Sequence, residues 1–217
     1  ECKKLGIPSI GIEAHPMAHF ASRVKVDWSP DPDGLLNHAG EIAEAALAGL
    51  HADGMEDDAL PLFGSTPAGP PRATTVKLRT LPPETRKLLL ADSISPLPLH
   101  KALVLLDTVQ QNRDERYYGH ELLALAKALV DSISNLQFGP EVGVGPAKPD
   151  APVIPSWMAA VRAMARDLRL LRPARGTGAL VHRADSRQML RVLEPNSVEA
   201  VITSPPYPNE KDYTRTT

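Results

Sequence analysis

The sequence has little cysteine, few aromatic residues and no long apolar run. Its 217 residues include a single cysteine, Cys2, so the chain can form neither an internal disulfide nor a cysteine-rich zinc site. Aromatic residues make up only 4% of the chain. No apolar run approaches the roughly 20 residues that are needed to cross a bilayer. These shortages predict a protein that works away from the membrane, in a reducing, cytoplasmic setting.

An excess of charge of one sign is also lacking. The 24 basic and 26 acidic residues give a formal net charge of -2. This balance argues against nucleic-acid binding over the whole surface, although a groove-binding part elsewhere stays open. Proline is abundant: its 22 residues make up about 10% of the chain, against a usual ~5%. This excess predicts many irregular connections.

The N-terminal part predicts a strand followed by helices. Residues 7–13 are a short apolar run that ends at Glu13, and we interpret them as a buried strand because Pro8 and Gly11 disfavour a helix. A helix is predicted over residues 16–26, with proline in its first turn. Apolar residues at helical spacing predict another helix over residues 35–50.

The middle of the chain predicts mainly helices joined by irregular segments. A loop rich in Asp, Gly and Pro is expected over residues 51–72, and a proline- and glycine-rich connection follows residue 138. The helices are expected over residues 83–90, 98–111, 117–134 and 156–171.

Strand, helix and strand are predicted again near the C-terminus. Residues 179–185 form a strand with an acidic end, Ser186 is a candidate N-cap for a helix over residues 187–193, and residues 198–203 form a second strand. This order implies parallel pairing through a right-handed crossover. We therefore predict an α/β fold with a large, mainly helical insert, divided into residues 1–50, 51–175 and 176–217.

The clearest chemical signal is the sequence Thr-Ser-Pro-Pro-Tyr at residues 203–207. In open α/β sheets, ligands bind at the carboxyl ends of strands. Two successive prolines fix φ and remove two backbone donors, which leaves a stiff turn of carbonyl oxygens. Ser204 Oγ and the Pro205 carbonyl can accept the two hydrogens of an exocyclic amine, while Tyr207 stacks on the base. The alternative is a proline-stiffened strand end with a surface tyrosine.

The run from Asp185 to Tyr207 resembles the approach to motif IV of the DNA amino-methyltransferases, written (Asp/Asn/Ser)-Pro-Pro-(Tyr/Phe/Trp). Serine in the first position is more similar to cytosine-N4 than to adenine-N6 enzymes, while the related protein-glutamine methyltransferases have asparagine. The resemblance implies methyl transfer from S-adenosylmethionine to a base flipped out of DNA, as in restriction-modification. It assigns the catalytic roles to Ser204, Pro205, Pro206 and Tyr207.

Residues 6–18 resemble motif II of the same family. In that motif the acidic residue that ends the second strand accepts hydrogen bonds from the cofactor ribose, and Glu13 holds this position. Asp185 matches the acidic end of the third strand, beside the cofactor adenine, and Ser186 flanks it. From the residues alone, Glu13 is better interpreted as a solvated strand-end carboxylate, whereas Asp185 is equally a charge favoured by a helix dipole.

The chain also departs from the family pattern. It lacks the glycine-rich motif I loop that holds the methionine part of the cofactor, and both ends read as cuts. The resemblance implies a partial Rossmann-like methyltransferase sheet whose central first strand is missing. Unpaired central edges are unfavourable, so we expect a fragment that is inactive by itself, with a complementing chain as one partner.

Three functions therefore stay open. The chain is a piece of a DNA amino-methyltransferase, a non-catalytic remnant that works only when another chain complements it, or a methyltransferase for RNA or a small amine. No metal site is predicted, because His15 and His19 are spaced to bind zinc but have no third ligand in register. A solvated face is favoured over a nucleic-acid stripe for the basic row of Arg162, Arg166, Arg169 and Arg172.

Overall fold

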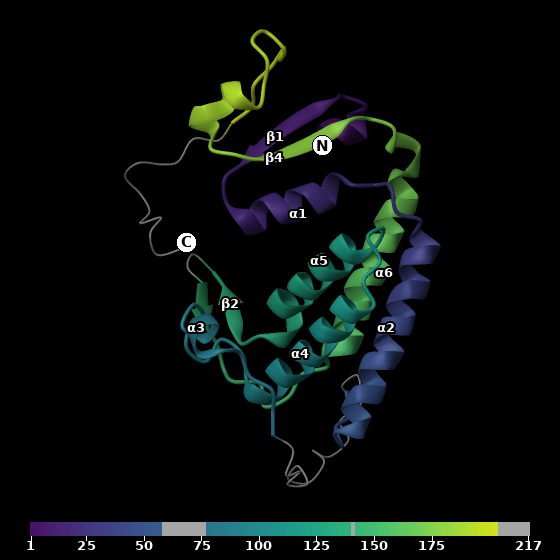
Figure 1. Ribbon diagram of the computed structural model, residues 1–217, viewed down its shortest axis with the longest axis vertical. Coiled ribbons are helices and arrows are strands. Elements are labelled where there is room, and N and C mark those ends of the chain that lie inside the picture. Colours follow the sequence, from purple (N-terminus) through teal and green to yellow (C-terminus); the bar gives the residue numbers. More distant parts are fainter. Residues whose placement is uncertain (58–76, 140–141, 204–217) are drawn as a thin grey trace. The chain divides into compact units, whose positions relative to one another are not determined.

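The computed structural model describes residues 1–57, 77–139 and 142–203 (Figure 1). It mixes helices with small sheets, and 55% of the described residues are helical. The chain divides into two compact units. The first contains residues 1–27 and the chain from Pro173 onward, with the short segment Phe138–Val142, and the second contains Trp28–Gln137 and Gly143–Arg172. The boundaries predicted at residues 50 and 175 stay predictions.

The first unit is built on a two-stranded parallel sheet. β1 (Ser9–Glu13) pairs with β4 (Ala179–Arg183), in a register that runs from Ser9 opposite Ala179 to Glu13 opposite Arg183. The strands lie side by side in Figure 1, with α1 (Pro16–Val26) packed against them. α1 begins and ends where the sequence predicted.

Two side chains fasten α1 to the rest of this unit. The Lys3 ammonium, in the short 3₁₀-helix η1 (Cys2–Leu5), donates to the Val26 carbonyl at the end of α1 across 2.7 Å. A cation is favoured there because the last carbonyls of a helix lack partners within the helix. A ring nitrogen of His19 lies 3.1 Å from the carbonyl oxygen of Val181, which joins the middle of α1 to β4.

The prediction of a strand over residues 198–203 is wrong. These residues have no regular structure, and the side chains of Val201 and Ile202 are 80% and 91% exposed. A strand is stable when its backbone groups pair with a neighbouring strand, and within the described chain the β1–β4 sheet offers no third strand. The helix predicted over residues 187–193 is the 3₁₀-helix η4 (Ser186–Arg191), which packs against β1.

The second unit is a bundle of four helices. α2 (Pro32–Ala52) lies along α6 (Val153–Leu171), and α4 (Pro96–Gln111) and α5 (Tyr118–Ala128) complete the bundle (Figure 1). Each of these helices was predicted, with ends that differ by a few residues. Their apolar faces meet in a core whose fully buried side chains include Leu35, Ile42, Leu50, Leu105, Val153, Trp157 and Val161.

Smaller elements lie between the bundle helices along the chain. α3 (Pro83–Arg86) is shorter than the predicted helix over residues 83–90. The final turn of the helix predicted over residues 117–134 is the π-helix η2 (Leu129–Ile133), which directly continues α5. β2 (Leu136–Phe138) and β3 (Val142–Val144) form a second two-stranded sheet, where the sequence predicted an irregular connection.

Candidate functional site

Two of the predicted cofactor residues lie at one edge of the β1–β4 sheet. Because the strands are parallel, β1 ends at Glu13 directly opposite the end of β4 at Arg183. The Ala184 amide donates to the Glu13 carbonyl across 3.2 Å and extends the ladder by one step, and Asp185 is the next residue. Glu13 and Asp185 therefore share the carboxyl edge, where ligands bind in open α/β sheets.

The Glu13 carboxylate is partly committed to the local structure. One oxygen, Oε1, accepts a hydrogen bond from the His15 amide across 2.8 Å, just before α1 begins. The positive end of a helix dipole favours an anion at this place. Within the described residues, Oε2 has no hydrogen-bond partner, so one oxygen of Glu13 is available to accept from a ligand hydroxyl.

The Asp185 carboxylate is more fully engaged. It is the N-cap of η4 and accepts from the Arg187 amide across 2.9 Å. The Arg187 guanidinium also bonds both carboxylate oxygens, with Nη2 2.5 Å from Oδ2. These bonds lower the pKa of Asp185 to about 2, and the bond from the guanidinium has the largest effect. The N-cap is therefore Asp185 and not Ser186, which was predicted for this position and is the first residue of η4. The roles of Asp185 and Ser186 beside an adenine stay predictions.

The predicted catalytic residues Ser204, Pro205, Pro206 and Tyr207 lie outside the described residues. Thr203, the last residue before them, belongs to the irregular chain that follows η4. The predicted role of this motif in binding an exocyclic amine therefore stays a prediction.

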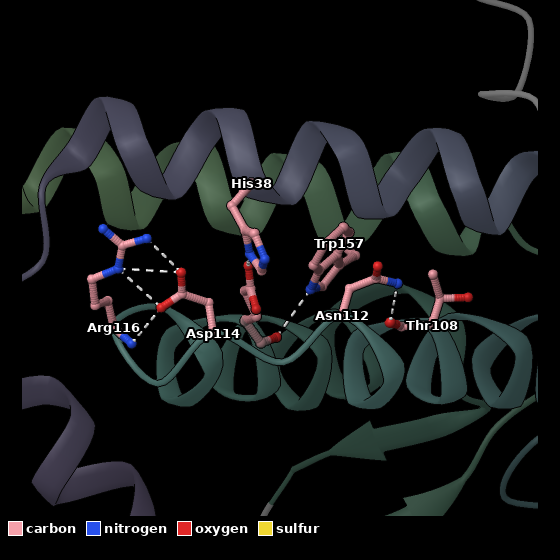
Figure 2. A network of polar contacts seen from close by, with 7 residues as sticks. His38, Thr108, Asn112, Asp114, Arg116 and Trp157 are labelled. Atoms are coloured by element: carbon pink, nitrogen blue, oxygen red, sulfur yellow. Dashed lines mark hydrogen bonds and ion pairs between the residues drawn. The ribbon is translucent and has the colours of Figure 1, made fainter.

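The second unit contains a buried polar network that the sequence pattern did not indicate (Figure 2). Glu121, on α5, is fully buried, and its Oε1 lies 2.6 Å from Nδ1 of His38 on α2. Its backbone carbonyl accepts from the Trp157 indole on α6 across 3.0 Å. Three helices therefore meet at one glutamate. The sequence feature that could have predicted the burial of Glu121 is its spacing: it precedes the buried Ala124, Leu125 and Ala128 by three, four and seven residues, on one face of α5.

The environment of Glu121 changes its acidity. Burial is the main cause that raises the pKa of Glu121, and the negative charge of Asp114 raises it further, while the hydrogen bond and charge of His38 act in the opposite direction. Asp114 is held ionised, because bonds from Arg116 lower its pKa to about 2. Figure 2 shows this Asp114–Arg116 pair beside the His38 side chain.

The hollows of the helical unit do not coincide with the predicted cofactor residues. One, of about 430 Å³, lies between α5 and α6 and is lined mainly by alanine and proline, among them Ala128, Pro155 and Ala159. Another, of about 290 Å³, is lined by residues 29–31 together with Arg116 and Tyr117. Neither contains a residue of the β1–β4 edge.

Over residues 1–57, 77–139 and 142–203, no three His, Cys, Asp or Glu side chains converge to hold a metal ion. None of the helices in this part of the chain is both long enough and apolar enough to span a membrane.

Comparisons of the chain with protein-family models, with curated proteins and with solved structures found no significant match.

Proposed function

We propose that this chain is a fragment of an S-adenosylmethionine-dependent DNA amino-methyltransferase, which methylates the exocyclic amine of a base, with cytosine N4 favoured over adenine N6. The observation that carries the proposal is the parallel pairing of β1 with β4, which brings Glu13 and Asp185 to one carboxyl edge. That edge would belong to a partial Rossmann-like sheet, and the Ser-Pro-Pro-Tyr sequence follows it along the chain.

In this proposal the cofactor supplies an electrophilic methyl group, and the chain binds and orients it. Glu13 uses its unengaged oxygen, Oε2, to accept from the ribose hydroxyls. Asp185 and Ser186 border the adenine, which requires Asp185 to exchange at least one Arg187 bond for the adenine amino group. Ser204 Oγ and the Pro205 carbonyl accept the amine hydrogens, Pro206 stiffens the turn, and Tyr207 stacks on the flipped base.

A second candidate function, a fragment that acts only with a complementing chain, is favoured by the outer edge of β1. Ser9 and Glu13 bond toward β4, so the backbone groups of Ile10 and Ile12 point away from it. Within the described residues, no strand pairs with that edge. A chain that supplied such a strand would complete the sheet. Methylation of RNA or of a small amine, instead of DNA, stays an alternative because the proposed turn contacts only the amine.

Calorimetric titration of the folded chain with S-adenosylmethionine tests the cofactor half of the proposal. Charged hydrogen bonds contribute about 1.5–3 kcal/mol each, so Glu13→Ala should weaken binding by about 10- to 100-fold. Glu84→Ala is the matched control, because Glu84 is an exposed glutamate on α3. Equal affinities of Glu13→Ala and the parent would contradict the role of Glu13. A folded parent chain that binds no cofactor would contradict cofactor binding by this fragment and favour the complementation alternative.

A further inference from the structure

Glu121 is a buried acid with only one of its carboxyl oxygens satisfied. Oε1 lies 2.6 Å from His38 Nδ1, whereas Oε2 is buried and has no hydrogen-bond partner among the described residues. The residue is 0% exposed, so the unpartnered oxygen has no contact with bulk solvent. An ionised carboxylate in such a place is far less favourable than a neutral carboxylic acid.

The described groups around Glu121 do not supply a partner for Oε2. His38, on α2, is the residue that meets Oε1, and its side chain is 17% exposed. Arg116, in the segment before α5, is committed to Asp114, which faces Glu121 as a second negative charge. From α6 the facing group is the uncharged Trp157 indole.

The two buried basic residues of α4 are engaged elsewhere. Lys101 pairs with two aspartates, Asp57 and Asp150, and His100 accepts from the Arg79 amide. His120, the neighbour of Glu121 on α5, is buried and has interactions of its own. His38 is therefore the group through which the protonation of Glu121 reaches another helix.

We propose that the contact of Glu121 with His38 is a proton-operated latch, in which the proton on the Glu121 carboxyl group fastens α5 to α2 and its loss loosens the helical unit. With that proton in place the carboxyl group is neutral, and a neutral acid tolerates an oxygen without a donor better than an ionised carboxylate does. With the proton lost, Oε2 belongs to a buried carboxylate that faces Asp114. The contact between α2 and α5 then carries an unfavourable charge.

The direction of the pH effect follows from the raised pKa of Glu121. A group that binds its proton more tightly in the folded state stabilises the fold fully below its unfolded pKa, here about 4.5. That stability is lost as the pH rises from this value through the folded pKa. Because one proton is involved, the unfolding equilibrium constant rises by up to about tenfold per pH unit within the window.

Urea unfolding of the full chain between about pH 5 and about pH 8, followed by tryptophan fluorescence, tests the latch. Both tryptophans, Trp28 and Trp157, lie in the helical unit, and Trp28→Phe leaves Trp157 as the reporter beside Glu121. Glu121→Gln replaces the acid with a neutral side chain of the same shape. Glu115→Gln is the matched control, because Glu115 is 77% exposed.

The parent and Glu115→Gln should lose stability with rising pH more steeply than Glu121→Gln, by up to about tenfold in the unfolding constant per pH unit. His38→Leu should extend that loss to higher pH, because it removes the group that opposes the raised pKa of Glu121. Parallel pH profiles of the parent and Glu121→Gln would overturn the proposal. If Glu121→Gln does not fold, the infrared C=O stretch of a protonated acid decides: its persistence in the parent chain above pH 4.5 supports the latch, and its absence overturns it.

Discussion

Lys101 and Asp57 form an ion pair inside the helical unit, with 3.1 Å between Nζ and Oδ1 and both side chains at most 2% exposed. Asp57 also accepts from the amides of Val153 and Ile154, across 3.0 and 2.6 Å. These are first-turn amides of α6, whose own N-cap, Pro152, provides no side-chain bond. A residue that follows α2 therefore caps α6, and Lys101 neutralises the cap.

Removing this cap should strongly destabilise the helical unit. Asp57→Ala leaves two buried amides and a buried ammonium with fewer partners, and we expect it to lower the free energy of unfolding by about 3–5 kcal/mol. Urea unfolding at neutral pH, followed by tryptophan fluorescence, measures the loss. Asp131→Asn is the control, because it breaks an exposed Lys127–Asp131 pair that should contribute less than about 1 kcal/mol.

The double variant Asp57→Ala with Lys101→Met should lose less than the sum of the two single variants. The two side chains are in contact, and the methionine leaves no buried charge behind. Additive losses, or a loss below about 1 kcal/mol for Asp57→Ala, would show that the cap is not coupled to the ion pair as the geometry indicates.

Asn135 connects two segments that flank the bundle. Its Nδ2 donates to the Asp92 carbonyl across 2.8 Å, and its Oδ1 accepts from the Lys148 amide across 2.9 Å. Its backbone bonds Ser93 and Gly145. Asn135→Ala leaves the partly buried Asp92 carbonyl and Lys148 amide without this partner, and we expect a loss of about 1–3 kcal/mol.

Hydrogen exchange should show where the loss falls. In Asn135→Ala the amide of Lys148 should exchange faster, while the core amides of α2 and α6 are much less affected. Asn135→Asp has nearly the same shape but no Nδ2 donor, so it should weaken the bond to Asp92 and leave an acceptor for Lys148. Unchanged exchange at Lys148 in Asn135→Ala would contradict this account.

The proposed catalytic turn makes a separate prediction, for a form of the protein that carries the complete set of methyltransferase motifs. Ser204→Ala or Tyr207→Ala should lower methyl transfer to DNA by about 100- to 1000-fold, because each removes a group that orients the amine or the base. Cofactor affinity, measured by calorimetry on the same variants, should stay nearly unchanged. Tyr207→Phe is the control, since it keeps the stacking ring. Normal turnover in either alanine variant would contradict the assignment.

The sequence predicted those elements whose limits are local. α1 begins at Pro16 and ends at Val26 as expected, because a proline in the first turn and helical spacing act over neighbouring residues. The strand expected over residues 198–203 failed because pairing with a neighbour is not a local property. Apolar periodicity indicates that a segment can be a strand, but not whether another strand lies beside it.

For the candidate sites, too, the sequence predicted the position along the chain but not the contacts of the side chains. An acidic residue after an apolar strand placed Glu13 and Asp185 at strand ends, and parallel pairing brought them to one edge. The sequence did not indicate that Asp185 would be taken up by Arg187, or that Glu121 would meet His38. Both contacts depend on where side chains lie in three dimensions, and the second joins residues 83 positions apart.

The ion pair between Asp33 and Arg169 has a consequence for the order of assembly. It joins the first turn of α2 to the last turn of α6, so the helical unit brings its own two chain ends together when it folds. β1 and β4 are separated by that whole unit, and their pairing would otherwise have to close a very long loop. A folded bundle shortens the effective loop about fivefold, which lowers the free-energy cost of closing it by roughly 1.4 kcal/mol. The folded helical unit thus helps two strands that are far apart in the sequence to pair, and we expect the sheet to form after the bundle.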